Sequence, residues 1–230
     1  MRGELPRSQV VSGWWVGVMP GILVLTTEPL PVPGSATTGA GLRAWGLAQG
    51  LRYRGLSVTI ATPVGLPSSS AADDRSGVRV LSFRRPDGLT ALLASEKPDV
   101  VVLQHWGLAA ELPELSCPLA IDLAGPHLLE RLYWGDPDPD RSLLEKLAAL
   151  RRSDFLTCSG HFQRHYFYPF LAQAGWDLRS PGLLPVIPFG VPPTQLTDSE
   201  KPLPAEPVFV YGGAFLAWQD PTRPIEWLLD

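Results

Sequence analysis

The chain reads ILVLT at residues 22–26, AGLRAWGLAQGLRYR at residues 40–54 and VTIA at residues 58–61. The first and third stretches are short and almost wholly apolar, as in strands that are covered on both faces. The middle stretch is long, has helical spacing and ends before Gly55, a residue type that commonly stops helices. A β-α-β unit is therefore expected to begin at Gly21.

The same alternation continues along the chain. Apolar runs such as VVVL at residues 100–103 predict further strands, and the amphipathic stretches between such runs predict helices. The pattern indicates an α/β fold, a Rossmann-like parallel sheet with helices on both faces. The further strands are expected at 78–83, 100–104, 119–122, 155–158 and 184–187, and the further helices at 89–95, 141–151 and 161–173.

A proline-rich stretch divides the chain. Six prolines lie between Pro188 and Pro207 among polar residues without periodicity, which is typical of a stiff linker. YGGAFLAWQDP at residues 211–221 then has the order strand, glycine turn and helix start, with a helix expected from Pro224 to Leu229. We predict a disordered extension at 1–19, one domain at 20–190, a linker at 191–207 and the start of a second, incomplete Rossmann-like domain at 208–230.

The composition favours a soluble globular protein without a nucleic-acid partner. Lys and Arg number 19 against 23 Asp and Glu, and the basic residues form only local pairs. Cys117 and Cys158 are the only cysteines, and their apolar neighbours favour free thiols in a reducing compartment. The apolar stretch 10–18 is too short to span a bilayer. We predict no transmembrane segment and a cytoplasmic location, compatible with peripheral contact at the inner membrane face.

The loop between the first strand and helix is a candidate phosphate site. Gly39 and Gly41 stand at the start of the helix, where backbone N–H groups are available to an anion. Ligands of open parallel sheets bind at this edge. The spacing does not match the dinucleotide fingerprint or a P-loop with its lysine, which disfavours bound NAD or a P-loop nucleotide. A flexible loop capped by Thr38 is an equally weighted alternative.

Six segments in a set order extend this pattern. Besides the β-α-β unit from Gly39 to Pro63 and the stretch from Tyr211 to Pro221, they are DVVVLQH (99–105), IDLAGPHLLE (121–130), DFLTCSGHFQ (154–163) and VIPFGVP (186–192). Together they resemble retaining glycosyltransferases of the GT-B type, glycosyltransferase family 4. The resemblance implies an N-terminal domain that binds the acceptor and a C-terminal domain that binds a nucleoside diphosphate sugar. It implies chemistry in the cleft between them, without a metal or other cofactor.

The resemblance also implies roles for individual residues. Gly39 and Gly41 correspond to the loop near the donor phosphates. Arg43 follows one step into the helix, where phosphate or substrate contact and a plain surface arginine are about equally weighted. Gly212 and Gly213 occupy the donor phosphate loop of the second domain, although the basic pair that is usual in the family is missing there.

The chain departs from the family after the strand that ends at Asp122. Relatives place a histidine there, whereas this chain reads DLAGPH, so Asp122 and His127 are the candidate catalytic residues, for acceptor orientation or proton transfer. A helix cap at Asp122 and a satisfied polar histidine at 127 are equally good alternatives.

Three further residues follow strands at the same edge. His105, His161 and Gln163 are therefore candidate acceptor-binding residues. Trp106 either adds an aromatic wall to this site or packs in the core. Ser159 is expected to cap the helix that begins near His161.

The sequence thus predicts part of a hexosyltransferase that moves a sugar from a nucleoside diphosphate sugar to a glycan, lipid-linked or small-molecule acceptor. We expect the 230-residue chain to be inactive alone, because the resemblance assigns donor binding to residues beyond Asp230, in a missing C-terminal domain or partner chain. Two alternatives stay open. One is a non-catalytic binding module or half-enzyme that needs a partner chain, and the other is a nucleotide-sugar epimerase-like enzyme.

Overall fold

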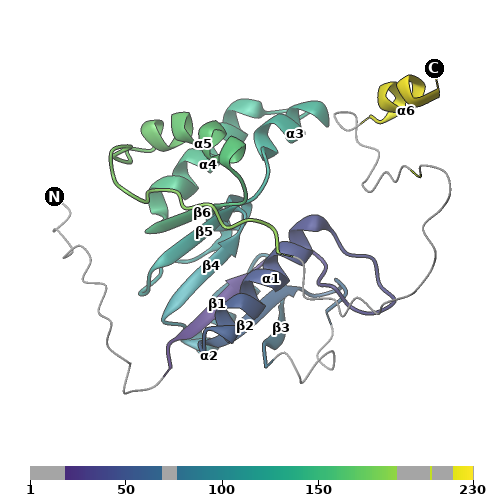
Figure 1. Ribbon diagram of the computed structural model, residues 1–230. Helices are drawn as coiled ribbons and strands as arrows, with labels where there is room; N and C mark the ends of the chain where they lie inside the picture. Colours follow the sequence, from purple (N-terminus) through teal and green to yellow (C-terminus); the bar gives the residue numbers. More distant parts are fainter. Residues whose placement is uncertain (1–18, 69–76, 191–207, 209–219, 230) are drawn as a thin grey trace.

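The computed structural model describes residues 19–68, 77–190, 208 and 220–229. Its centre is a six-stranded sheet in the order β3-β2-β1-β4-β5-β6, in which all neighbouring strands are parallel (Figure 1). The predicted α/β, Rossmann-like sheet is therefore confirmed. The strands are β1 (Gly21–Leu25), β2 (Ser57–Pro63), β3 (Arg79–Phe83), β4 (Val100–Gln104), β5 (Leu119–Leu123) and β6 (Phe155–Cys158).

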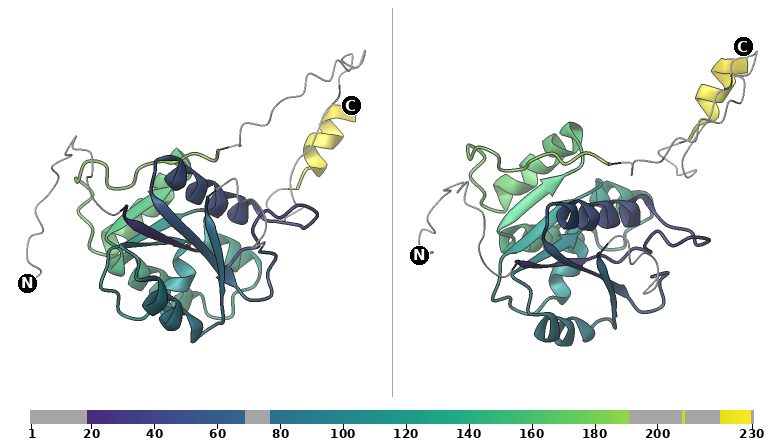
Figure 2. Two further views of the ribbon diagram at one scale, coloured as in Figure 1. Left: turned by 90° about the horizontal axis from the view of Figure 1, so that it is seen from below. Right: turned by 60° about the horizontal axis from the view of Figure 1, so that its bottom comes forward.

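Helices cover the two faces of this sheet. The left view of Figure 2 shows α1 and α2 on opposite sides of the strands. None of the described helices has the length and apolarity that a membrane span requires. The helices are α1 (Gly39–Tyr53), α2 (Gly88–Glu96), the 3-10 helix η1 (Trp106–Glu111), α3 (His127–Tyr133), α4 (Pro139–Arg152), α5 (His161–Gln173) and α6 (Thr222–Leu229).

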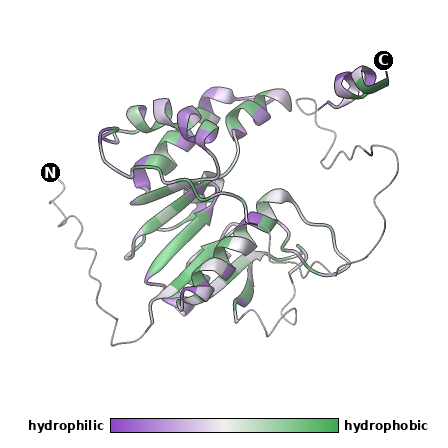
Figure 3. Cartoon of the chain, in the orientation of Figure 1, coloured by the Kyte–Doolittle hydropathy of each residue, from purple (hydrophilic) through white to green (hydrophobic). Residues whose placement is uncertain are grey.

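Two apolar cores lie on the two faces of the sheet. The strands contribute side chains to both cores, because successive residues point to opposite faces. In β1, Ile22 and Val24 pack with Ala44 and other residues of the α1 side, while Leu23 and Leu25 pack with α2, η1, α4 and α5. Successive side chains of a strand point to opposite faces, so one apolar run serves both cores. Figure 3 accordingly shows the strands as a mostly hydrophobic layer.

Most predicted elements have the observed bounds within two residues. The strands at 100–104 and 155–158 and the helix at 161–173 agree at both ends, and α6 includes the helix predicted from Pro224. Cys117 and Cys158 are both free thiols, as predicted. The short helices η1 and α3 were not predicted, and no residue of α3 is buried.

The strand predicted at 184–187 is wrong. This segment makes a single parallel bridge between Val186 and Cys158, in which Cys158 N–H donates to Pro185 (3.1 Å) and Ile187 N–H donates to Cys158 (2.8 Å). Pro188 follows directly and has no N–H with which to extend the pairing. The predicted extension 1–19 (except Met19), the linker 191–207 and the donor-loop glycines Gly212 and Gly213 lie outside the described residues.

Candidate functional site

A row of polar side chains crosses the sheet near the carboxyl ends of its strands, on the α1 side. Strand register places Gln104 beside Asp122, Asp122 beside Thr157, and Thr62 beside Ser82. Each of these polar residues lies within one position of the end of its strand, where open parallel sheets bind ligands. We call it the polar row: Ser82, Thr62, Thr26, Gln104, Asp122 and Thr157.

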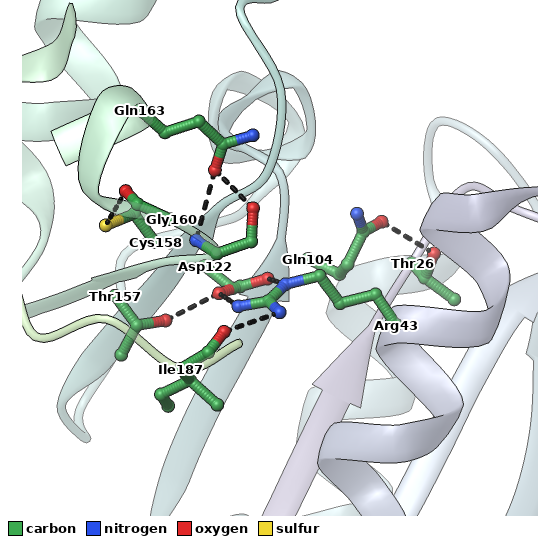
Figure 4. Close-up of polar contacts among 10 residues, drawn as sticks. Thr26, Arg43, Gln104, Asp122, Thr157, Cys158, Gly160, Gln163 and Ile187 are labelled. Carbon is green, nitrogen blue, oxygen red and sulfur yellow. Dashed lines mark hydrogen bonds and ion pairs between the residues drawn. The ribbon is translucent and has the colours of Figure 1, made fainter. Parts of the chain in front are cut away.

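Asp122 and Arg43 form a buried ion pair above this row (Figure 4). Arg43 Nε lies 2.6 Å from Asp122 Oδ2, and Arg43 Nη2 lies 2.7 Å from Oδ1. Thr157 Oγ1 donates a further bond of 2.6 Å to Oδ1. The two-pronged geometry is the strongest arrangement of an arginine and a carboxylate.

The same guanidinium reaches the segment that follows α5. Arg43 Nη1 donates to the Ile187 carbonyl at 2.8 Å, and the Phe189 ring centroid lies 5.0 Å from Arg43 Cζ. Arg43 is 4% exposed and Asp122 is 1% exposed. Each of the three side-chain nitrogens of Arg43 thus has a hydrogen-bond partner in the protein. Both carboxylate oxygens of Asp122 also accept hydrogen bonds. The pair therefore has a structural role, because it connects α1 to β5, β6 and the segment at 187–189.

The sequence did not predict that these two residues meet. It weighed phosphate or substrate contact against a plain surface arginine for Arg43, and acceptor orientation or proton transfer against a helix cap for Asp122. The surface arginine and the helix cap are wrong, because Arg43 is buried and Asp122 lies in β5. In this geometry either of the functional roles requires the buried pair to open. The two residues are 79 positions apart in the chain, so no local sequence pattern indicates that they pair. The usable hint was their placement, since Asp122 lies at the end of a predicted strand and Arg43 lies near the start of a helix.

Gln104 presents an unpartnered donor in the middle of the polar row. Thr26 Oγ1 donates to Gln104 Oε1 at 3.1 Å. Gln104 Nε2 is buried and has no hydrogen-bond partner among the described residues, although the residue is only 2% exposed. Buried donors are nearly always paired, so this group is a candidate contact for water or ligand oxygen.

The start of α1 is both capped and tightly packed. Thr38 Oγ1 accepts from Gly41 N–H at 2.9 Å, so the predicted Thr38 cap is confirmed, and Thr38 Oγ1 donates to Glu28 at 2.8 Å. A Cβ on Gly41 would lie 2.1 Å from the Pro29 carbonyl oxygen, whereas one on Gly39 would meet nothing within 4 Å. Gly41 is therefore required by the packing of the loop, while Gly39 lies at an open helix terminus.

His105 and His127 come together from the ends of β4 and β5. Their ring centroids are 3.7 Å apart in an edge-to-face arrangement, and His105 also lies against Trp106. His105 has a φ of 88°, an unusual value for a side chain of this size. Gly125 makes room for the second ring, since it has a φ of 85° and a Cβ there would lie 3.3 Å from His127 Nε2.

Hydrogen bonds distinguish the two nitrogens of each ring. His105 Nδ1 accepts from Gly107 N–H at 3.1 Å, so the proton of the neutral ring belongs on Nε2. His127 Nδ1 lies 2.8 Å from Glu130 Oε2 and donates to it, which leaves His127 Nε2 as an acceptor in the neutral ring. Both Nε2 atoms are buried without a partner among the described residues.

Both imidazoles are neutral near pH 7. Burial holds the pKa of His105 well below its usual range, and the charges of His127, Lys146 and Arg131 lower it further. Burial also lowers the pKa of His127, although Glu130 opposes this shift. One ring therefore offers a donor and the other an acceptor, the combination that a hydroxyl group can satisfy at once.

The remaining predicted residues lie at the start of α5. Gln163 Oε1 accepts from Ser159 N–H at 3.1 Å and from the Ser159 hydroxyl. The predicted Ser159 cap is wrong, because the N-cap position is Gly160, which has no side chain to offer. His161 is exposed and makes none of these contacts. Trp106 is buried in the core, the second of the two interpretations of that residue.

Sequence reasoning missed several polar residues around the histidine pair. Glu130 was visible only as a residue three positions after His127, the spacing of helical neighbours. Lys146 and Tyr166, whose side chains contact each other between α4 and α5, were not predicted as site residues. Within the described residues, no group of three or more His, Cys, Asp or Glu side chains is placed to hold a metal ion.

No protein-family model matches the chain, and no curated protein matches it. Solved structures that match include Phytolacca americana UGT2 complexed with UDP-2fluoro-glucose and pterostilbene, at 12% identity and a TM-score of 0.46. Another is an alpha-glucosyltransferase in complex with UDP and a 13-mer DNA containing a central A:G mismatch, at 14% identity and a TM-score of 0.38. The matches cover 76% and 63% of this chain but only 55% and 39% of those chains.

Proposed function

We propose that this chain is the acceptor-binding part of a GT-B glycosyltransferase of the retaining, family 4 type. The reaction would move a sugar from a nucleoside diphosphate sugar to a hydroxyl of a glycan, lipid-linked or small-molecule acceptor. The observation that carries the proposal is the meeting of His105 and His127 at the carboxyl edge, within two of the segments that resemble the family. This is the edge at which open parallel sheets bind ligands.

His127 is the residue that we propose to orient the acceptor. Its neutral Nε2 would accept a hydrogen bond from the acceptor hydroxyl, with Glu130 holding the ring through Nδ1 at 2.8 Å. His105 Nε2–H would donate to the same hydroxyl oxygen. This leaves a lone pair of that oxygen directed at the sugar carbon. We propose that Asp122, paired with Arg43, positions β5 and the following loop and does not contact the acceptor.

The donor diphosphate is proposed to lie against the start of α1. Gly39 offers an open helix terminus there, and helix N-termini stabilise phosphate charge. Gly212 and Gly213 would complete the donor loop from the second domain. Stabilisation of the departing diphosphate by preorganised dipoles needs no metal. It does need the donor domain, so the 230-residue chain alone is proposed to be inactive. The site of action is proposed to be the cytoplasm.

The test uses the product of the native gene, including any sequence that follows Asp230. It would be incubated with UDP-, GDP- and ADP-sugars, and sugar transfer and donor hydrolysis would be followed by mass spectrometry. We expect turnover of one donor class, and a loss of about 100-fold in kcat for His127→Gln, the usual size of a lost proton-handling or orienting group. His165→Gln, an exposed histidine on α5, is the matched control and should retain full activity.

Two results would contradict the proposal. If none of these donors is turned over or bound, glycosyl transfer is the wrong reaction class. If His127→Gln and His165→Gln have the same activity, His127 does not orient the acceptor. Transfer by the 230-residue chain alone would contradict only the proposed dependence on a donor domain.

A further inference from the structure

A buried glutamine ends the apolar run of β4. The strand reads VVVLQ, and Gln104 is 2% exposed. Thr26 Oγ1 donates to Gln104 Oε1, and the amide nitrogen has no partner among the described residues. In Figure 4 this nitrogen points away from the Arg43–Asp122 pair. A leucine or methionine would avoid the cost of an unpaired buried amide, so the glutamine calls for a role beyond packing.

A chain of hydrogen bonds holds this amide in place. Glu28 N–H donates to Thr26 Oγ1 at 3.1 Å, and Thr26 Oγ1 donates in turn to the amide. Thr38 Oγ1 donates to Glu28 Oε2 at 2.8 Å and accepts from Gly41 N–H. The contacts that shape the β1–α1 loop and cap α1 thus also fix the position of Gln104.

The amide is incomplete in either of its two orientations. Turned by 180°, Nε2 would donate to Thr26 Oγ1, and Oε1 would then be the atom without a partner among the described residues. A hydroxyl group completes both orientations, because it accepts from an N–H and donates to a C=O. The missing partner of Gln104 therefore has the chemistry of a hydroxyl.

The surroundings favour an uncharged ligand. Strand register places Gln104 beside Asp122, whose carboxylate is already paired with Arg43. All three side-chain nitrogens of Arg43 have partners in the protein, and the polar row contains no cation of its own. A phosphate or carboxylate would meet a neutral amide beside a carboxylate, without a free positive charge to offset its desolvation.

Unpartnered nitrogens gather at this end of β4. In the part of the chain that the structure describes, four buried side-chain polar atoms lack a partner, and three of them belong to Gln104, His105 and His127. Gln104 and His105 are consecutive, and the rings of His105 and His127 are 3.7 Å apart. One hydroxyl at the histidine pair would leave Gln104 unpaired, whereas a ligand with a second hydroxyl can satisfy all three.

We propose that Gln104 is a specificity-determining residue that binds a second hydroxyl of an uncharged polyol acceptor, whose first hydroxyl lies at the His105–His127 pair. The inference rests on the proposed function for the role of the polyol as acceptor, whereas the contact itself is tested without turnover. It selects acceptors with two hydroxyls on one ring over lipid alcohols and phenols with a single hydroxyl.

The experiment is an NMR titration of the ¹⁵N-labelled 230-residue chain. The side-chain NH₂ signals of Gln104 are assigned through bonds and confirmed by their loss in Gln104→Met. The uncharged polyol probes are myo-inositol and the methyl glycosides of glucose, galactose and mannose. Cyclohexanol is the ring with a single hydroxyl, and inorganic phosphate is the anion. We expect one or more polyols to shift the Gln104 signals and to give them an intermolecular nuclear Overhauser effect, and cyclohexanol and phosphate to give neither.

Two variants complete the titration. Gln104→Met should weaken binding of that polyol about 10-fold, the usual size of one lost neutral hydrogen bond. Gln173→Met removes an exposed amide at the end of α5 and should bind the polyol as the unchanged chain does.

Four results would overturn the inference. The Gln104 signals could show contact with water only, whichever polyol is present, which would make the partner a buried water. Phosphate could shift these signals while no polyol does, or cyclohexanol could shift them as much as the polyols do. Lastly, Gln104→Met, still folded by circular dichroism, could bind the polyol as tightly as the unchanged chain.

Kinetics of the native gene product separate this inference from the proposed function. Gln104→Met should raise the acceptor KM about 10-fold and leave kcat unchanged, because the contact holds the acceptor equally in the ground and transition states. Polyol contact at Gln104 without any sugar transfer would refute the proposed function and keep the polyol site. Sugar transfer that depends on His127, with an unaltered acceptor KM in Gln104→Met, would refute the role of Gln104 alone.

Discussion

At the scale of single residues, the Arg43–Asp122 pair is the contact on which the α1 side of the sheet depends. Both partners are buried and hydrogen-bonded, so removal of one leaves an uncompensated charge in the interior. We expect Arg43→Met to lower the free energy of unfolding by about 3–5 kcal/mol, measured by urea denaturation.

A double variant separates the charge penalty from lost packing. Arg43→Met with Asp122→Leu removes both charges and should recover most of the loss, because an apolar pair of similar volume is often neutral in such a position. Arg179→Met breaks the exposed pair with Asp177 and should leave the urea midpoint unchanged. Equal losses in the single and double variants would show that the unpaired charge is not the cause.

Lys146 makes stability depend on pH in a predictable direction. Burial lowers its pKa from an ordinary 10.5 to about 7, so between these values the unfolded chain binds a proton that the folded chain does not. Stability then rises with pH across this window, by at most about 1.4 kcal/mol per pH unit. Lys146→Met should equal or exceed the wild type in stability at pH 6, and its advantage should shrink by pH 9. A constant difference between the two proteins in thermal melts at these pH values would contradict this expectation.

At the scale of elements, the glycines of α1 differ in the space that is available for a Cβ atom. A Cβ on Gly41 would collide with the Pro29 carbonyl and approach the Thr37 hydroxyl at 2.8 Å, whereas a Cβ on Gly46 or Gly50 would meet nothing within 4 Å. Gly41→Ala should therefore destabilise the protein by about 1–3 kcal/mol through forced movement of the β1–α1 loop.

The other two glycines provide the matched comparison. Gly46→Ala and Gly50→Ala should each stabilise by about 0.5–1 kcal/mol, because alanine loses less backbone entropy in a helix interior. Thermal unfolding of the three variants at one pH tests both the expected loss of stability in Gly41→Ala and the expected gain in Gly46→Ala and Gly50→Ala. A destabilised Gly46→Ala variant would indicate that something packs closely on this face of α1.

At the scale of the whole molecule, one sheet joins two cores into one cooperative unit. Ile60 belongs to the core on the α1 side, and Leu103 belongs to the core on the α2, α4 and α5 side. Because the strands supply both cores, loss of either should unfold both. We expect Ile60→Ala and Leu103→Ala each to cost about 2–5 kcal/mol. Circular dichroism and tryptophan fluorescence should report one common transition, and a second transition in either variant would contradict this coupling.

The sequence alone determined the elements and their layering, because these follow from local periodicity. Runs such as VVVL at residues 100–103 are apolar on both faces, and the helices between them have a 3.6-residue repeat, so a parallel sheet covered on both sides was predictable. The prediction at 184–187 failed for a local reason, because Pro185 and Pro188 limit this segment to one bridge. α3 is only seven residues long and buries none of them, although it carries Leu128, Leu129 and Leu132.

Only the tertiary structure decided which side chains meet at the site. Parallel crossovers bring strands together that are far apart in the chain, so Arg43 reaches Asp122 and Thr26 reaches Gln104 across 79 and 78 residues. The placement of His105 and His127 at one edge of the sheet was predictable, because both follow the ends of predicted strands. This is why both were candidate site residues. Their contact, the tautomers set by Gly107 and Glu130, and the burial of Lys146 depend on the packing of several elements at once, and no pattern along a single chain encodes such distances.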